Sequence, residues 1–183
     1  MGQNDRSETE MYKSFASDPK SIPDKLFVLE AWHGAQWEVA FSDLVIERVD
    51  DNDVKELAKM IRTDHQKASE KLRPIAKKLN VQLMDGLPPM KQAKLELLGK
   101  LSSDQLVKCY LANQRAMHAK DITSFGDHAV LAMNEEVKAF ARDTLPTLRE
   151  HGNHIIQIAS TKGMTGDFVT AGGGSMNEPV NGQ

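Results

Sequence analysis

Residues 54–79 read VKELAKMIRTDHQKASEKLRPIAKKL, and this stretch decides the fold. Its apolar side chains recur at alternating steps of three and four residues, the spacing that places them on one face of an α-helix. The stripe consists of Val54, Ala58, Ile61, His65, Ala68, Leu72, Ile75 and Leu79. One member, His65, is polar and can bind a metal. The sequence therefore predicts a long helix that buries one histidine near its middle.

Three other segments show the same period, and each carries one metal-capable side chain in its stripe. Residues 24–48 place Phe27, Ala31, Gly34, Glu38, Phe41 and Val45 on one face. A third helix, for which Ser103 is the expected N-cap, carries Val107, Leu111, Gln114, His118, Ile122, Phe125 and Ala129. A fourth, with Asn134 as the expected N-cap, carries Val137, Ala141, Thr144, Leu148, His151, Ile155 and Ile158. Serine and asparagine accept hydrogen bonds from the first backbone N–H groups of a helix, so both are suitable caps.

Four amphipathic helices of similar length predict an all-α protein built as a four-helix bundle over residues 24–160. Residues 1–23 are polar and read as a loose N-terminal arm, and the glycine-rich residues 161–183 read as a flexible C-terminal tail. The connector between the second and third helices, residues 81–103, carries Leu95, Leu98 and Leu101 at helical spacing and predicts a short extra helix. A compact connector gives an up-down-up-down bundle, whereas an extended one crosses the bundle length. The sequence leaves both open.

Composition excludes several classes of function. Of the 183 residues 40% are hydrophobic and only 5% aromatic, and the formal net charge is -3 with both signs interspersed, so no basic surface for nucleic acid is predicted. The single cysteine, Cys109, cannot form an intrachain disulfide. No apolar run is long enough to span a bilayer. The polar amino terminus is not a signal peptide, which favours a cytoplasmic protein, or a periplasmic or envelope protein if the sequence is a processed or trimmed form.

The four polar stripe residues predict one shared site. A carboxylate and imidazoles are costly in an apolar interior unless something satisfies them, and a divalent ion bound by Glu38, His65, His118 and His151 would do so. Imidazole ligands suit Zn, Cu, Fe or Ni. The alternative is a structural or interaction module whose histidine layer fixes helix packing without metal.

Three neighbouring residues have predicted positions relative to this site. Asp121 and His154 each lie one helical turn after a proposed ligand and share its face, so they are expected to support the ligands. Asp64 points about 100° away from His65 on a helix of 3.6 residues per turn and is expected to face solvent.

Several segments also resemble a bacterial family of unknown function whose members are often labelled "predicted outer membrane protein" or "putative membrane protein". The matching elements are Phe27 with Gly34 and residues 38–39 (EV), residues 60–65 (MIRTDH), Tyr110 with His118, residues 137–141 (VKAFA) and residues 144–151 (TLPTLREH). The resemblance covers about residues 24–160. It implies a ferritin-like bundle, usually exported, with no established reaction. Met117 and His128 replace acidic residues of the family, and its usual signal peptide is missing here.

The predicted function is therefore metal binding, with metal sequestration or stress-related redox chemistry as its expected role. A carboxylate-bridged di-iron site is not expected, because the long helices carry no Glu-x-x-His pair. Homo-oligomerisation and a protein partner for the tail are further expectations that the sequence leaves open.

Overall fold

The computed structural model describes residues 9, 10, 12, 13 and 15–164. In the described residues, a short 3-10 turn, η1, precedes five α-helices. Their bounds are η1 Pro19–Ser21, α2 Ile22–Arg48, α3 Asn52–Lys78, α4 Pro89–Leu98, α5 Ser103–Leu131 and α6 Glu135–Thr161. The predicted all-helical class is confirmed. The predicted tail from residue 165 onward lies outside the described residues.

The helices begin where polar side chains satisfy the free N–H groups of the first turn. Asp51 accepts a hydrogen bond from the backbone N–H of Val54 at the start of α3, and Asn134 caps α6 as predicted. The cap of α5 is Ser102 rather than the predicted Ser103. Ser102 and Gln105 form a capping box, in which each side chain bonds the other residue's backbone N–H.

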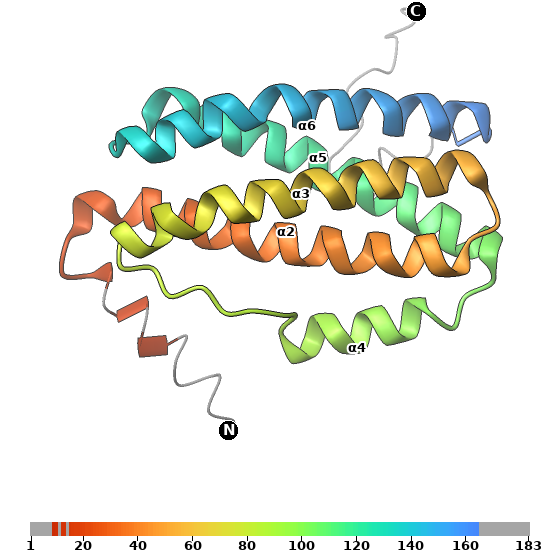
Figure 1. Cartoon of the computed structure of the whole chain (residues 1–183), viewed down its shortest axis with the longest axis horizontal. Coiled ribbons are helices and arrows are strands. Elements are labelled where there is room, and N and C mark those ends of the chain that lie inside the picture. Colours follow the sequence, from red (N-terminus) through yellow and green to blue (C-terminus); the bar gives the residue numbers. More distant parts are fainter. Residues whose placement is uncertain (1–8, 11, 14, 165–183) are drawn as a thin grey trace, which may run out of the picture.

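The four long helices lie side by side, and neighbouring helices run antiparallel (Figure 1). Between α2 and α5, Phe27 packs on Phe125 near one end while Ser42 bonds Tyr110 toward the other, so the contact partners run in opposite order. The same reversal appears between α3 and α6 and between α5 and α6, in the contacts Asp64–His151, Lys78–Glu136, His118–His151 and Phe125–Phe140. Consequently α2 and α6 run in one direction and α3 and α5 in the other.

This order settles the topology that the sequence left open. Because α3 and α5 are parallel, the connector between Lys78 and Ser103 passes along the length of the helices, and it carries α4 on the outside of α2 (Figure 1). Lys91 and Lys94 of α4 hold their ammonium groups 4.8 and 4.9 Å from the centre of the Trp37 ring. The predicted connector helix is present.

The interior consists of two apolar clusters separated by a polar layer. One cluster contains Phe27, Leu72, Phe125, Phe140 and Leu148 among others. The second contains Trp37, Phe41, Ile61, Tyr110 and Ile155 among others. The buried polar residues Glu38, His65, Gln114, His118 and His151 lie along their helices where the first cluster gives way to the second. The polar stripe residues therefore lie at one level of the structure.

One residue of the predicted N-terminal arm, Phe15, packs against the helices. Phe15 is only 2% exposed and packs in the first apolar cluster, and the ammonium of Lys25 lies 5.4 Å from the centre of its ring. Burying a phenylalanine side chain contributes about 1.5–3 kcal/mol, so Phe15 anchors this segment to the first apolar cluster.

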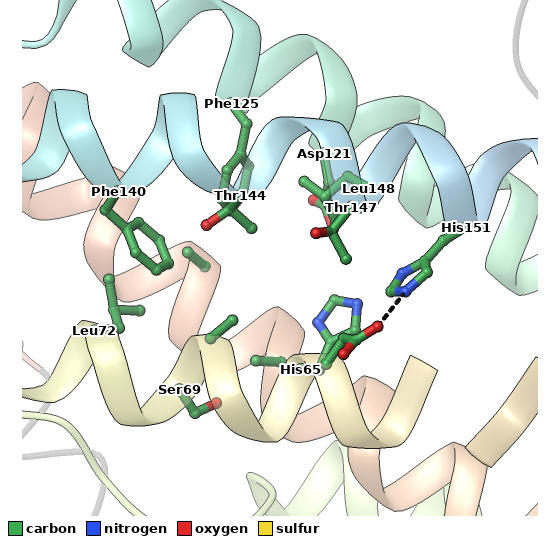
Figure 2. Close-up of a pocket in the computed structure, with 14 residues that line it drawn as sticks. His65, Ser69, Leu72, Asp121, Phe125, Phe140, Thr144, Thr147, Leu148 and His151 are labelled. Atoms are coloured by element: carbon green, nitrogen blue, oxygen red, sulfur yellow. Dashed lines mark hydrogen bonds and ion pairs between the residues drawn. The ribbon is translucent and has the colours of Figure 1, made fainter. Parts of the chain in front are cut away.

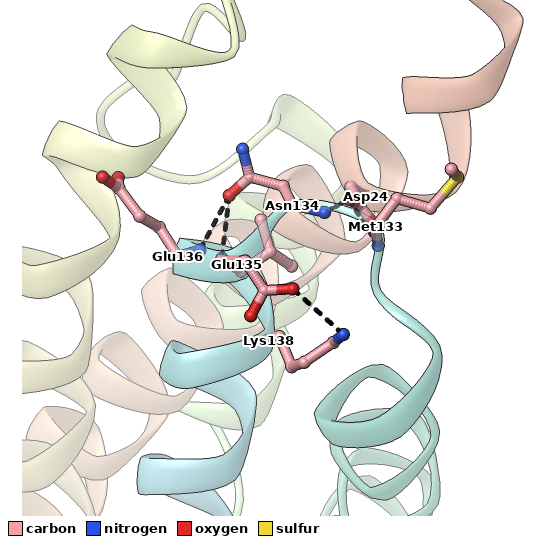
Figure 3. Close-up of polar contacts among 7 residues, drawn as sticks. Asp24, Met133, Asn134, Glu135, Glu136 and Lys138 are labelled. Atoms are coloured by element: carbon pink, nitrogen blue, oxygen red, sulfur yellow. Dashed lines mark hydrogen bonds and ion pairs between the residues drawn. The ribbon is translucent and has the colours of Figure 1, made fainter.

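Buried Asp24 of α2 fixes the turn between α5 and α6. Its carboxylate accepts hydrogen bonds from the backbone N–H groups of Met133, at 3.1 Å, and Asn134, at 2.7 Å (Figure 3). The Asn134 side chain in turn caps α6 by accepting from Glu136 and Val137. This turn sets the register between the two helices that carry His118 and His151.

None of the helices in the described part of the chain has an apolar stretch of the length that a bilayer crossing requires.

Candidate metal centre

Three of the four predicted ligands meet in the interior. His65 of α3, His118 of α5 and His151 of α6 each place one ring nitrogen within 4.8 Å of the other two, and all three side chains are buried. The ring centroids lie 5.2 to 5.8 Å apart. Three neutral imidazoles from three separate helices therefore converge on one small volume.

The hydrogen bonds of two of these rings define which nitrogens carry protons. His118 Nδ1 lies 3.0 Å from the backbone carbonyl oxygen of Gln114, which can only accept, so Nδ1–H donates. His151 Nε2 lies 3.2 Å from Oδ2 of Asp64 and donates to that carboxylate. In neutral rings, the other two nitrogens, His118 Nε2 and His151 Nδ1, then have only lone pairs. They face each other at 3.2 Å.

Burial opposes protonation of the three rings. Desolvation, together with the neighbouring His151, lowers the pKa of His118 from 6.5 to about 4. Desolvation also lowers the pKa of His65 well below its usual value, and lowers that of His151 despite the nearby Asp64 carboxylate. The facing lone pairs of His118 and His151 therefore have no proton between them at neutral pH.

His65 contributes a third nitrogen and borders a small cavity. Its Nε2 atom is buried and has no hydrogen-bond partner. Figure 2 shows His65 and His151 reaching from α3 and α6 toward the same space, with Asp121 and Thr147 beside them. The cavity has a volume of about 30 Å³ and extends from the histidines toward Phe140.

Glu38, the fourth predicted ligand, is not in this cluster of ligand atoms. It is fully buried, and its Oε2 accepts a 2.5 Å hydrogen bond from the Gln114 amide. Desolvation raises the pKa of Glu38 from 4.5 to about 8, so the carboxyl is protonated at neutral pH. Glu38 Oε1 and Gln114 Oε1 both lack partners. A protonated Glu38 can donate a hydrogen bond. Gln114 contacts both neighbours, because its side-chain amide donates to Glu38 and its backbone carbonyl accepts from His118.

The neighbours of the ligands differ from expectation in two respects. Asp64, expected to face solvent, accepts the hydrogen bond of His151, and the hydrogen bonds from Lys67 and His151 outweigh its partial burial and lower its pKa. His154, expected to support the site, borders a different pocket formed by α3 and α6. Asp121 does border the cavity, as its position on the His118 face predicts. Desolvation raises the pKa of Asp121 from 3.8 to about 6.

The contact of Asp64 with His151 could not be predicted from α3 alone, because its partner lies on α6. A side chain about 100° from the buried stripe lies at the edge of α3, and the adjacent helix α6 presents His151 at that edge. The signal that could have identified Asp64 is its position next to His65 at an interface between two helices.

Comparison with known proteins places the chain in a family. A solved structure titled "Crystal structure of DUF305 fragment from Deinococcus radiodurans" has a similar fold, with a TM-score of 0.64 at 15% identity over 76% of this chain and 96% of that chain. At that identity the likeness concerns the fold alone. Among proteins with curated descriptions, none matches the sequence. The model of the family described as "Domain of unknown function (DUF4142)" matches residues 10–158, and the chain therefore belongs to this family.

Proposed function

We propose that this protein binds one divalent transition-metal ion through His65, His118 and His151. The observation that carries the proposal is the pair of ring nitrogens, His118 Nε2 and His151 Nδ1, whose lone pairs face each other at 3.2 Å in a buried site. Two lone pairs at that distance repel unless a cation lies between them. Because burial lowers the pKa of both rings, a metal ion fits the position better than a proton.

The distances support such an ion. Zinc–nitrogen bonds of about 2.0–2.1 Å in a tetrahedral site place two ligand nitrogens about 3.3 Å apart, close to the 3.2 Å between His118 and His151. The largest separation in the cluster of three nitrogens is 4.8 Å, so His65 has to turn slightly inward to complete the site. Its Nε2 atom has no hydrogen-bond partner to give up in doing so. Zn, Cu, Fe and Ni all accept imidazole ligands.

The helix order also supports a ferritin-like reading of the bundle. Ferritin-like folds join two antiparallel helix pairs by one long crossover, which is the role of residues 79–102 here. Their di-iron sites use about four carboxylates. Here the cluster consists of imidazoles, which favours a mononuclear ion and a role in metal binding or sequestration, with redox chemistry as a further expectation if the ion is Cu or Fe.

Ligation by Glu38 remains a prediction. A metal ion that drew Glu38 into its coordination would have to displace the carboxyl proton and break the bond from Gln114. Metal uptake would then release a proton per ion above the number released by the histidines. If Glu38 is a ligand, Glu38→Gln releases fewer protons per bound ion than the wild type. If it is not, the two proteins release the same number.

The test is a zinc titration of tag-free protein from which metal has been removed with a chelator. We expect one ion per chain in the wild type and at least tenfold weaker binding in His118→Gln. The matched control is His128→Gln, because His128 makes the same type of ring-to-carbonyl bond, to Ser124 at 2.8 Å, outside the cluster. Equal zinc affinity in the wild type and His118→Gln would refute the proposal.

A structural role without metal is the second candidate. The His151–Asp64 hydrogen bond joins α6 to α3, and the His118 and His151 rings, with centroids 5.2 Å apart, pack α5 against α6. If these contacts serve only to fix helix packing, His118→Gln lowers the free energy of unfolding, and neither the wild type nor the variant retains zinc after gel filtration.

The compartment, self-association and a partner for the tail, residues 161–183, also remain predictions. Removing residues 163–183 is expected to leave the fold of the helical domain intact. If the tail docks on a partner, the truncated chain loses the proteins that co-purify with the full chain.

A further inference from the structure

We propose that the cavity beside the histidines is a binding site for a small exogenous ligand of two or three non-hydrogen atoms, the size of peroxide or azide, which would occupy the open coordination position of the bound ion. This inference rests on the proposed metal site. Three protein ligands leave one position of a tetrahedral ion open, as in catalytic rather than structural zinc sites. The cavity borders both His65 and His151, so the open position has a space to face.

The cavity has the size for such a ligand. A single water needs roughly 10–15 Å³ of this kind of volume, and the cavity provides about 30 Å³. A ligand of two or three atoms fits, whereas a sugar, nucleotide or amino acid does not.

The polar groups of the cavity point to a ligand that forms hydrogen bonds. Ser69 Oγ is buried and lacks a partner, and Ser69 borders the cavity. Buried polar atoms without partners are costly, and a polar ligand would satisfy the Ser69 hydroxyl. Thr147 and Asp121 lie on the opposite side of the space (Figure 2). Leu72 and Phe140 close its far end with apolar surface.

A wider groove on the α2 and α5 side adjoins the cavity. The groove shares Ala31, Asp121 and Phe125 with the cavity, so these residues form the boundary between them. It contains two lysines, Lys91 and Lys120, and two acidic residues, Glu30 and Asp121, and Lys120 pairs with Glu30 at 3.2 Å, so its charges favour neither sign of ligand. The small volume and the unpartnered Ser69 hydroxyl therefore select a small polar molecule such as peroxide, for which azide serves as the probe.

The test uses the copper-loaded full chain and azide as the probe. Azide bound to Cu(II) produces a new absorption band and changes the copper EPR spectrum. We expect saturable azide binding in the wild type. Ala68→Leu, which places a larger side chain at the cavity wall, should bind one copper per chain but weaken azide binding at least tenfold. Thr144→Leu, on a different helix, is the second filling variant if Ala68→Leu does not fold.

The matched control is Ala119→Leu, the same substitution at an exposed position next to His118, which should bind azide as the wild type does. Copper bound without any azide-dependent spectral change, or equal azide affinity in the filled variants and the wild type, would overturn the cavity site while leaving the metal site intact. Failure of the wild type to bind copper would instead refute the proposed metal site, and with it this inference.

Discussion

His118 and Glu38 hold their uncharged forms for the same physical reason, and both depend on Gln114. Burial lowers the pKa of the imidazole and raises that of the carboxyl, because an apolar interior disfavours either charge. The Gln114 carbonyl accepts from His118, and its amide donates to Glu38. The polar layer of the metal-free protein is therefore neutral, apart from Asp64 at its edge.

Glu38→Gln should stabilise the metal-free protein in a pH-dependent manner. The folded chain keeps Glu38 protonated up to about pH 8, whereas the unfolded chain loses the proton above 4.5. Wild-type stability therefore falls as the pH rises through that window, by about 1.4 kcal/mol per pH unit. A glutamine avoids this loss and still pairs with Gln114. Urea unfolding should show no difference near pH 4.5 and an advantage of about 3 kcal/mol for the variant at pH 7.

The control for this comparison is Glu47→Gln, an exposed position on the same helix, which should show no such trend. A Glu38→Gln effect of constant size from pH 4.5 to 7 would contradict a protonated Glu38.

Asp64→Ala should weaken zinc binding by about 10- to 100-fold, the usual effect of removing a hydrogen-bond acceptor behind a metal-bound histidine. The Asp64 carboxylate holds the proton on Nε2 of His151 and so keeps Nδ1 free for the metal. In Asp64→Ala the proton can move to Nδ1. Lys67→Ala is the matched control, since it breaks the ion pair of Asp64 with Lys67 but leaves the bond to His151. Competition with a coloured zinc chelator measures the affinities. Equal affinity in Asp64→Ala and Lys67→Ala would contradict this role.

At the scale of the helices, the polar stripe residues reach one level because the turns between helices are fixed. The turn between α5 and α6 depends on Asp24, which accepts the backbone N–H groups of Met133 and Asn134 (Figure 3). Asp51 and Ser102 similarly fix where α3 and α5 begin. Local sequence thus sets the length and the start of each helix.

Asp24→Ala should lower the free energy of unfolding by about 3 kcal/mol, because it leaves two partly buried N–H groups without a charged acceptor. Asp43→Ala, also on α2, removes an exposed ion pair with Arg62 and should have little effect. Urea denaturation of both variants at pH 7 measures the difference. A loss no larger in Asp24→Ala than in Asp43→Ala would show that the turn does not depend on this carboxylate.

The features predictable from sequence are those that one helix determines alone. The apolar stripe of residues 54–79, the Asn134 cap and the burial of His65, His118 and His151 all follow from helical period and capping chemistry. The register between neighbouring helices does not follow from these local rules. The pairing of Glu38 with Gln114, and the reach of Asp64 to His151, depend on how α2 meets α5 and how α3 meets α6. The apolar stripe therefore correctly predicted that Glu38 is buried, but it did not predict that the carboxyl of Glu38 contacts the Gln114 amide.

At the scale of the whole molecule, the proposed metal site lies between two apolar clusters. An ion bound there joins α3, α5 and α6, and it binds only the folded chain. Zinc at about 100 times its Kd should therefore raise the free energy of unfolding by about 2.7 kcal/mol. Thermal melts with and without zinc measure this, with His128→Gln behaving as the wild type and His118→Gln showing no increase. Equal increases in both variants would indicate zinc bound elsewhere.

Whether the three histidines hold an ion is decided by X-ray absorption at the zinc edge. The measurement uses tag-free protein loaded with one equivalent of zinc. We expect imidazole scattering from three nitrogen ligands at about 2.0–2.1 Å, lost when His65, His118 and His151 are all replaced by alanine. A first shell without imidazole, or an unchanged spectrum in the triple variant, would contradict this expectation.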